Sequence, residues 1–166
     1  MISPLISLMQ DQHKQLPTLL PSLILSGTLQ PQSLIRTITL LQSGIIRVLF
    51  ISPEKLFSSL FRILISSTSL ASQIRLIVID EAHCISSWSY NFRSDYLRLH
   101  NIVHVIRQTS PHCSLLALTA TGGSQVRADI CQQLELSDEN VVDCGWRRKE
   151  VQMCAVSGSQ PFVCLQ

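Results

Sequence analysis

The chain has 166 residues, of which 46% are hydrophobic and only 14% are charged. The length is that of one ordinary domain, and this composition excludes an intrinsically disordered, highly charged chain. The net charge of +2 is too small by itself to indicate a nucleic-acid partner. We expect no membrane span, because the longest uncharged stretch, residues 15–35, is interrupted by prolines and polar residues.

Two of the predicted helices share the same start, a serine followed by a proline. Ser3-Pro4 and Ser52-Pro53 each offer a capping hydroxyl followed by a residue suited to the first helical position. Other helices are predicted where apolar residues recur at helical spacing. Together the helices are expected over residues 4–16, 31–43, 53–64, 96–106 and 126–134.

Short, continuous apolar runs lie between these helices, at residues 47–51, 76–79 and 115–118. Runs of this kind are typical of a parallel sheet that is covered on both faces. The alternation therefore predicts an α/β fold, a parallel sheet flanked by helices, over residues 1–143. Residues 144–166, where the pattern fades, are expected to form a divergent or poorly ordered tail.

An apolar strand that ends in two carboxylates carries the clearest chemical signal. Asp80 and Glu81 follow residues 76–79, and ligands of open α/β sheets bind outside the carboxyl ends of the strands. Asp80 is suited to hold hydrated Mg²⁺ on the β- and γ-phosphates of a nucleotide, and Glu81 to orient and deprotonate the attacking water. A solvated acidic turn is the alternative interpretation. A metal site that uses His83 and Cys84 is another, although the six cysteines include no C-x-x-C pair and we expect them to be reduced thiols.

Aromatic residues are scarce in this chain, yet four of them fall within residues 88–96. Trp88 stands among serines, which favours an exposed, functional ring over a buried one. Tyr96 shares an apolar helical face with Leu99 and Val103, which favours a place in the core.

Four blocks of the sequence, in this order, resemble the RecQ family of DNA helicases. Residues 2–12 are similar to motif Ia of that family and residues 51–56 to motif Ib. Residues 80–83 form a DEAH box, which continues through residues 83–97 into an aromatic-rich loop, and residues 118–121 are similar to motif III. The tract from Trp88 to Arg98 resembles the RecQ-four (Rothmund–Thomson type) branch.

The resemblance implies part of a RecA-like P-loop NTPase domain that uses ATP and Mg²⁺. Asp80, Glu81 and His83 would be the catalytic residues, with Asp80 holding the metal through water. Other residues would contact single-stranded or forked DNA and couple this binding to hydrolysis. They are Ser3, Pro4, Ser52, Pro53, Trp88, Phe92, Arg93, Thr119 and Thr121. Exposed rings stack on bases of any sequence, and an arginine adds cation–π attraction.

The sequence also departs from the family pattern. It contains no G-x-x-x-x-G-K-[ST] phosphate loop, and the second RecA-like domain with its arginine finger is missing. We therefore expect a helicase domain truncated at both ends, with one apolar strand left as an unpaired edge. Such a chain alone should neither hydrolyse ATP measurably nor unwind DNA.

The sequence thus predicts a fragment of an ATP-dependent 3′–5′ DNA helicase of repair, recombination and replication. The expected location is the nucleus, or the nucleoid and cytoplasm of a prokaryote. Two alternatives stay open. One is a non-catalytic product that binds nucleic acid or a partner, and the other is a fragment of a DEAH-type RNA helicase, against which the aromatic tract argues.

Overall fold

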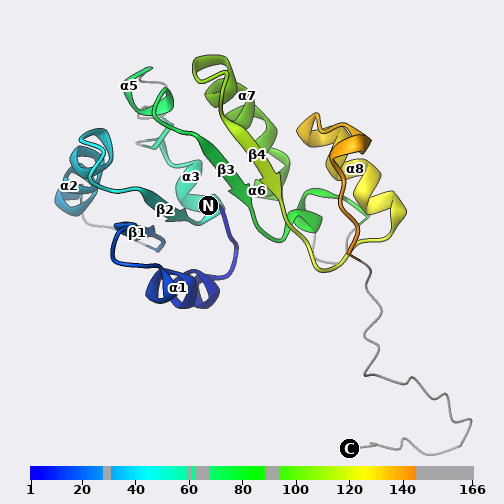
Figure 1. Cartoon of the computed structure of the whole chain (residues 1–166), viewed down its shortest axis with the longest axis horizontal. Coiled ribbons are helices and arrows are strands. Elements are labelled where there is room, and N and C mark those ends of the chain that lie inside the picture. Colours follow the sequence, from blue (N-terminus) through cyan, green and yellow to red (C-terminus); the bar gives the residue numbers. More distant parts are fainter. Residues whose placement is uncertain (28–30, 60, 63–67, 89–93, 145–166) are drawn as a thin grey trace, which may run out of the picture.

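The computed structural model describes residues 1–27, 31–59, 61–62, 68–88 and 94–144. Its strands are short and parallel, and helices flank them, so the predicted α/β class is confirmed (Figure 1). In chain order the described elements are α1 (Ile6–Gln15), β1 (Ser22–Leu25), α2 (Pro31–Gln42), β2 (Val48–Ile51), α3 (Pro53–Leu56), α5 (Thr68–Ala71), β3 (Leu76–Ile79), η1 (Ala82–Ile85), α6 (Ser94–Leu97), α7 (Leu99–Thr109), β4 (Ser114–Ala117), α8 (Ser124–Leu134) and η2 (Asp138–Asn140).

The sheet consists of two parallel pairs that a single residue connects. β1 pairs with β2, and β3 pairs with β4. Ile2 forms parallel bridges to both Ile51 at the end of β2 and Ile79 at the end of β3. The first residues of the chain therefore lie between the two pairs and join them at the carboxyl ends of the strands.

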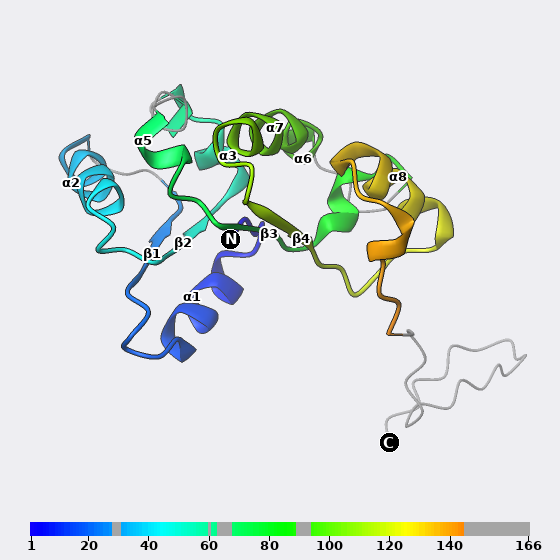
Figure 2. The same ribbon diagram turned by 45° about the horizontal axis from the view of Figure 1, so that its top comes forward.

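Helices cover the sheet unevenly. Figure 2 shows α1 on one face, below β1 and β2, whereas α3, α5, α6 and α7 lie on the other face. The α7 helix buries Leu99, Val103 and Ile106, and these residues belong to the same apolar core as Ile77 and Ile79 of β3. No helix among the described residues has the length and apolarity needed to cross a membrane.

Most predicted elements are confirmed, and the differences have local causes. The α2 helix begins at Pro31, and its carboxyl end is followed by Gly44, whose φ of 70° lies in the left-handed region that glycine adopts without strain. The helix expected over residues 96–106 is divided into α6 and α7 at Arg98. Strand β1 was not predicted, because its four residues follow Pro21 in a stretch rich in proline, serine and threonine.

Two predictions extend into residues outside the described ranges. The helix expected over residues 53–64 is described for α3 and for residues 59 and 61–62, whereas residues 60 and 63–67 are outside. Nearly all of the predicted tail, residues 145–166, is also outside the described part of the chain.

Candidate functional site

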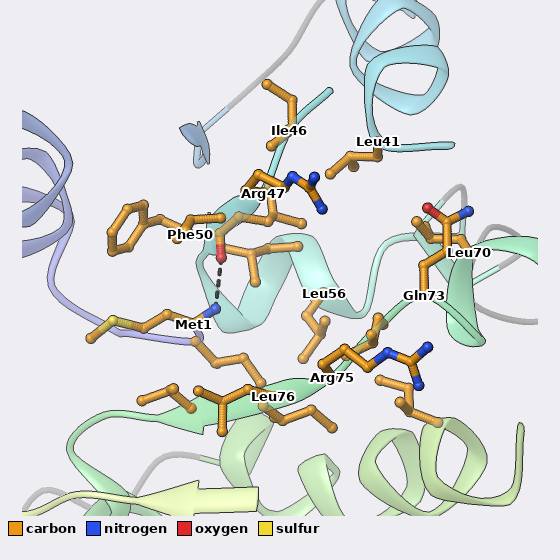
Figure 3. A pocket seen from close by; sticks show the side chains of 18 of the residues that line it. Met1, Leu41, Ile46, Arg47, Phe50, Leu56, Leu70, Gln73, Arg75 and Leu76 are labelled. Atoms are coloured by element: carbon orange, nitrogen blue, oxygen red, sulfur yellow. Dashed lines mark hydrogen bonds between the residues drawn. The ribbon is translucent and has the colours of Figure 1, made fainter. Parts of the chain in front are cut away.

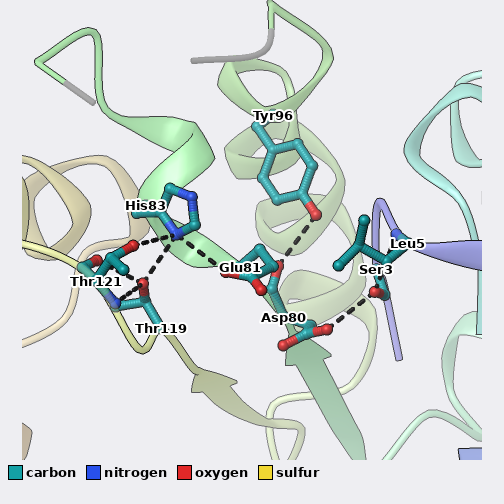
Figure 4. Close-up of polar contacts among 8 residues, drawn as sticks. All are labelled: Ser3, Leu5, Asp80, Glu81, His83, Tyr96, Thr119 and Thr121. Carbon is teal, nitrogen blue, oxygen red and sulfur yellow. Dashed lines mark hydrogen bonds and ion pairs between the residues drawn. The ribbon is translucent and has the colours of Figure 1, made fainter. Parts of the chain in front are cut away.

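Asp80 lies at the point where β3 meets the bridging segment. Its backbone N–H donates to the carbonyl of Ile2 at 2.9 Å, and its carbonyl accepts a hydrogen bond of 3.0 Å from the buried hydroxyl of Tyr96. One carboxylate oxygen, Oδ2, accepts from the Ser3 hydroxyl at 2.9 Å (Figure 4). The carboxylate is therefore held in one orientation at the edge of the sheet by a residue 77 positions away.

The prediction that Ser3 caps the first helix is wrong. Ser3 is fully buried, its N–H donates to the carbonyl of Ile51, and Leu5 still has extended dihedral angles, so α1 begins only at Ile6. The cause is the bridge between the two strand pairs, which keeps residues 1–3 extended. The serine hydroxyl orients Asp80 instead of capping a helix.

The helix predicted to begin after Ser52 is correct in position, but Ser52 does not make the predicted capping contact. Ser52 is the residue before α3 and Pro53 is the first helical residue, yet the Ser52 side chain makes no capping hydrogen bond. Both residues are buried, and the Ser52 N–H donates to the carbonyl of Leu25.

Glu81 and His83 form a contact at the entry to η1. Glu81 has φ 50° and ψ 44°, a left-handed conformation that costs a residue with a Cβ on the order of 1–3 kcal/mol. This turn brings the Glu81 Oε2 to 3.1 Å from Nδ1 of His83, which is itself buried. Strain at a candidate site is consistent with a functional constraint on the direction of the carboxylate.

His83 also contacts the segment that follows β4. Its Nδ1 lies 3.0 Å from Oγ1 of Thr119 and 3.2 Å from Oγ1 of Thr121 (Figure 4). The register of β3 and β4 explains this approach, since Ile79 pairs with Ala117 and the two strands therefore end side by side. The structure thus brings together four of the residues predicted to act at this site.

The partners of the imidazole indicate where its proton lies. The Glu81 carboxylate only accepts hydrogen bonds when ionised, and the Thr119 hydroxyl already donates to the carbonyl of Thr121 at 2.6 Å. Both groups therefore require a donor on the ring, which assigns the proton to Nδ1 of His83. Nδ1 thereby joins the carboxylate after β3 to the hydroxyl after β4.

The aromatic residues divide as the sequence suggested. Tyr96 is buried at 1% exposure, which confirms its place in the core, and Trp88 is 71% exposed five residues after His83. The predicted coupling residues Phe92 and Arg93 lie outside the described residues. The hydrogen bond from Tyr96 to the Asp80 carbonyl was missed, although a tyrosine placed in an apolar core signals that its hydroxyl needs a polar partner.

The donor set at this edge suits a hard cation. Asp80 and Glu81 supply carboxylate oxygens, the ligands that Mg²⁺ prefers together with several waters. Among the described residues no group of three or more histidines, cysteines, aspartates and glutamates is placed to hold a metal, which leaves the zinc interpretation of His83 and Cys84 without further ligands. Cys84 is buried.

Comparison with known proteins identifies the family. The model of the DEAD/DEAH box helicases matches residues 1–129. The chain belongs to this helicase family. Its fold is accordingly part of a RecA-like domain, as predicted.

The relatives found among curated proteins are RecQ helicases, which confirms the predicted resemblance. The chain is 39% identical over 145 residues to the ATP-dependent DNA helicase Q-like 5 of Arabidopsis thaliana, a match that covers 85% of this chain and 15% of that protein. It is 35% identical over 158 residues to the ATP-dependent DNA helicase RecQ of Bacillus subtilis, covering 95% of this chain and 26% of the relative. It is 37% identical over 147 residues to the mouse bifunctional 3′-5′ exonuclease/ATP-dependent helicase WRN, a match that covers 89% of this chain and 10% of that protein.

The chain thus spans about a quarter or less of the length of these relatives. Membership of the RecQ-four branch remains a prediction.

Proposed function

We propose that this chain forms most of the first RecA-like domain of a RecQ-type, ATP-dependent 3′–5′ DNA helicase that acts in DNA repair, recombination and replication. The observation that carries the proposal is the single polar network at the carboxyl ends of β3 and β4, in which Glu81, His83 and Thr119 are in contact. The relatives from Arabidopsis thaliana and Bacillus subtilis are named ATP-dependent DNA helicases, which supports DNA as the nucleic acid. In a eukaryote we assign the protein to the nucleus.

The two carboxylates have different tasks in this proposal. Asp80 is the residue that would hold hydrated Mg²⁺, and its hydrogen bond from Ser3 uses only one carboxylate oxygen. Glu81 orients the attacking water and takes its proton, while His83 fixes the direction of the Glu81 side chain. Mg²⁺ supplies charge neutralisation when it is bound, and the residues of this chain supply the positioning.

Coupling to DNA runs through the two segments that leave this network. Trp88 presents an exposed indole on which a base can stack, a contact worth about 1–3 kcal/mol. We assign Phe92 and Arg93 to the same loop. Thr119 and Thr121, which contact the imidazole of His83, transmit changes at the nucleotide site to this loop.

Two serine–proline pairs stand next to the helices that this proposal places at the DNA surface. Ser3 and Pro4 precede α1, Ser52 precedes α3 and Pro53 is the first residue of α3; Ser3, Ser52 and Pro53 are buried. Phosphate contacts in this proposal therefore come from N–H groups in the first turn of α1, since the first such groups of a helix lack intrahelical partners.

The test is a chimera in which residues 1–143 replace the matching segment of the Bacillus subtilis RecQ helicase, to which the chain is similar over 158 residues. The chimera should hydrolyse ATP in response to single-stranded DNA, and Glu81→Gln should lower the turnover about 100-fold or more, because it removes the general base. Glu139→Gln, at an exposed position of η2, is the control for loss of one carboxylate. Unchanged turnover in the Glu81→Gln chimera would contradict the assignment.

Trp88→Ala in the same chimera separates DNA sensing from hydrolysis. Basal ATP turnover should be retained, whereas stimulation by single-stranded DNA should be lost. If RNA stimulates the parent chimera as well as DNA does, the choice of DNA is wrong.

A non-catalytic binding role is the second candidate for the 166-residue chain alone, because its sequence contains no phosphate loop. The purified chain should then bind single-stranded DNA without ATP turnover above that of its Glu81→Gln variant. DNA-stimulated turnover by the chain itself would contradict this expectation.

A further inference from the structure

An arginine stacks on an aromatic ring where α3 meets the junction of α6 and α7. Arg98 separates α6 from α7, and its Cζ lies 4.7 Å from the centroid of the Phe57 ring. A guanidinium at this distance over an aromatic face is attracted by the ring. Phe57 directly follows α3, so the pair joins the segment after β2 to the segment after β3. Neither residue belongs to the polar network of the candidate site.

Buried residues next to this pair hold the two segments against each other. Leu56, the last residue of α3, and Tyr96 of α6 belong to the same apolar core. The two helices are in contact and lie on the same face of the sheet (Figure 2). Tyr96 also donates from its hydroxyl to the carbonyl of Asp80. The backbone at Arg98 is therefore anchored two residues away, whereas Arg98 itself is exposed.

The stacked guanidinium keeps its hydrogen-bond donors available. In the part of the chain that the structure describes, Arg98 forms no ion pair, although the adjoining helices contain Glu54 and Asp95. Its backbone N–H donates to the carbonyl of Asp95, and no hydrogen bond of the guanidinium is found among the same residues. Stacking covers a face of the guanidinium and leaves the N–H groups, which lie in its plane, for an acceptor.

A planar fork of donors with a permanent charge suits phosphate. Two parallel N–H groups match two phosphate oxygens, which gives a bidentate contact. The ring of Phe57 also restricts the side chain before any ligand arrives, so less conformational entropy is lost when Arg98 binds.

The surroundings of Arg98 indicate which phosphate it meets. The α6 helix contacts η1, and η1 leads through the buried Ser86 to Trp88, whose backbone N–H donates to the Ser86 hydroxyl at 3.2 Å. The exposed indole of Trp88 and the exposed guanidinium of Arg98 thus extend from two segments that pack together. A base stacked on the indole brings a sugar–phosphate backbone to this surface.

We propose that Arg98, held in place by Phe57, binds a backbone phosphate of single-stranded DNA. The proposal rests on the proposed helicase function, from which it takes its ligand. Arg98 makes the contact, and Phe57 is a positioning residue. Because phosphates are alike in every sequence, the contact adds affinity without a preference for any base. It also places DNA on the short helix whose tyrosine is bonded to Asp80.

The experiment measures the binding of oligo(dT) to the full 166-residue chain by fluorescence anisotropy at several salt concentrations. Each phosphate contact with a single strand contributes about 0.7 to the slope of log affinity against log salt. Arg98→Ala should lower the slope by about this amount and weaken binding about tenfold at low salt. Oligo(dA) should show the same loss, because the contact does not involve the base.

Variants of Phe57 separate positioning from charge. Phe57→Leu keeps the arginine but removes the ring, so the slope should be retained while the affinity falls about two- to fivefold. Phe57→Tyr keeps an aromatic face and should bind like the parent. Arg98→Lys keeps the charge without the planar fork, so it should also retain the slope and bind more weakly.

Arg107→Ala, at an exposed position in the last turn of α7, is the control for loss of one positive charge. Its slope should equal that of the parent chain. Equal losses for Arg107→Ala and Arg98→Ala would overturn the proposal, because net charge alone would then explain them. An unchanged slope for Arg98→Ala would overturn it as well.

Urea denaturation of the same variants tests a purely structural role. If Arg98→Ala and Phe57→Leu destabilise the chain alike and leave the slope unchanged, the pair only joins α3 to α6 and the phosphate contact is excluded.

The chimera separates failure of this proposal from failure of the proposed function. Arg98→Ala should raise the concentration of single-stranded DNA that gives half-maximal stimulation about tenfold. A parent chimera that DNA does not stimulate would contradict the helicase function and this proposal with it. A stimulated parent whose half-maximal concentration is unaffected by Arg98→Ala would overturn the assignment of Arg98 alone.

Discussion

The two ends of the same strands differ sharply in this molecule. At their carboxyl ends, β2 and β3 are joined through Ile2 and Ser3, and a continuous set of hydrogen bonds extends from Ser3 through Asp80 to Tyr96. At their amino ends the same strands separate around an apolar cavity (Figure 3). The residues of the candidate site lie at the carboxyl ends, where the strands are joined.

This difference teaches how little sequence is needed to assemble the candidate site. Three bridging residues place the Asp80 carboxylate, and a parallel register places the threonines beside His83. The gap at the other end does not disturb these contacts. The geometry of the site therefore depends on the bridge and on the register of β3 and β4.

The largest expected effect comes from breaking the bridge. Ile2→Ala should destabilise the chain by about 2–5 kcal/mol, because it removes buried methyl groups at a residue that pairs with both strand pairs. Ile6→Ala, at a position that is 45% exposed, should cost far less. The check is urea denaturation of both variants, and equal costs would mean that the bridge does not hold the two halves together.

The stability of the chain should depend on pH, because the Met1 amine at the start of the bridge is buried. Burial lowers the pKa of the Met1 amine from 8.0 to about 6 in the folded chain, so the unfolded chain binds more protons between these values. The free energy of unfolding should therefore rise by on the order of 2 kcal/mol from pH 6 to pH 8.

Chemical denaturation across this range measures the effect. A chain acetylated at its amino terminus is the control, because it carries no titrating amine and should lack this contribution. An identical pH profile for both chains would show that the amine is not the cause.

Glu81 has a left-handed backbone conformation, so at this position glycine should give a more stable protein than alanine. Glu81→Gly should be more stable than Glu81→Ala by about 1 kcal/mol, since glycine adopts the left-handed conformation without a Cβ penalty. Glu135, with φ 53° after α8, should show the same inversion. Thermal unfolding of the four variants provides the comparison, and only the changes at Glu81 should abolish ATP turnover in the chimera.

Local patterns were enough to predict most of the fold and the identity of the acidic residues. The apolar runs of β2, β3 and β4 are continuous, and the periodicity of α7 and α8 is clear, so these elements were found from sequence. The same patterns placed Tyr96 in the core and Trp88 on the surface.

What the sequence could not supply are the contacts between distant residues. The hydroxyl of Ser3 reaches Asp80 only because the first residues join two strand pairs, and a local capping rule has no access to that fact. Likewise, the position of Thr119 beside His83 depends on the register of β3 and β4. The left-handed turn at Glu81 has no sequence signal, since glutamate rarely adopts it.

The most direct test of the account measures how strongly DNA stimulates ATP turnover when the imidazole is removed. In the chimera, His83→Ala should lower basal turnover, because Glu81 loses the contact that fixes its direction, and should also abolish the ratio of DNA-stimulated to basal turnover, because the contact between Glu81 and the threonines is broken. His100→Ala, at an exposed position of α7, should leave both rates unchanged. Full DNA stimulation in the His83→Ala chimera would contradict the central claim that this network couples the nucleotide site to DNA.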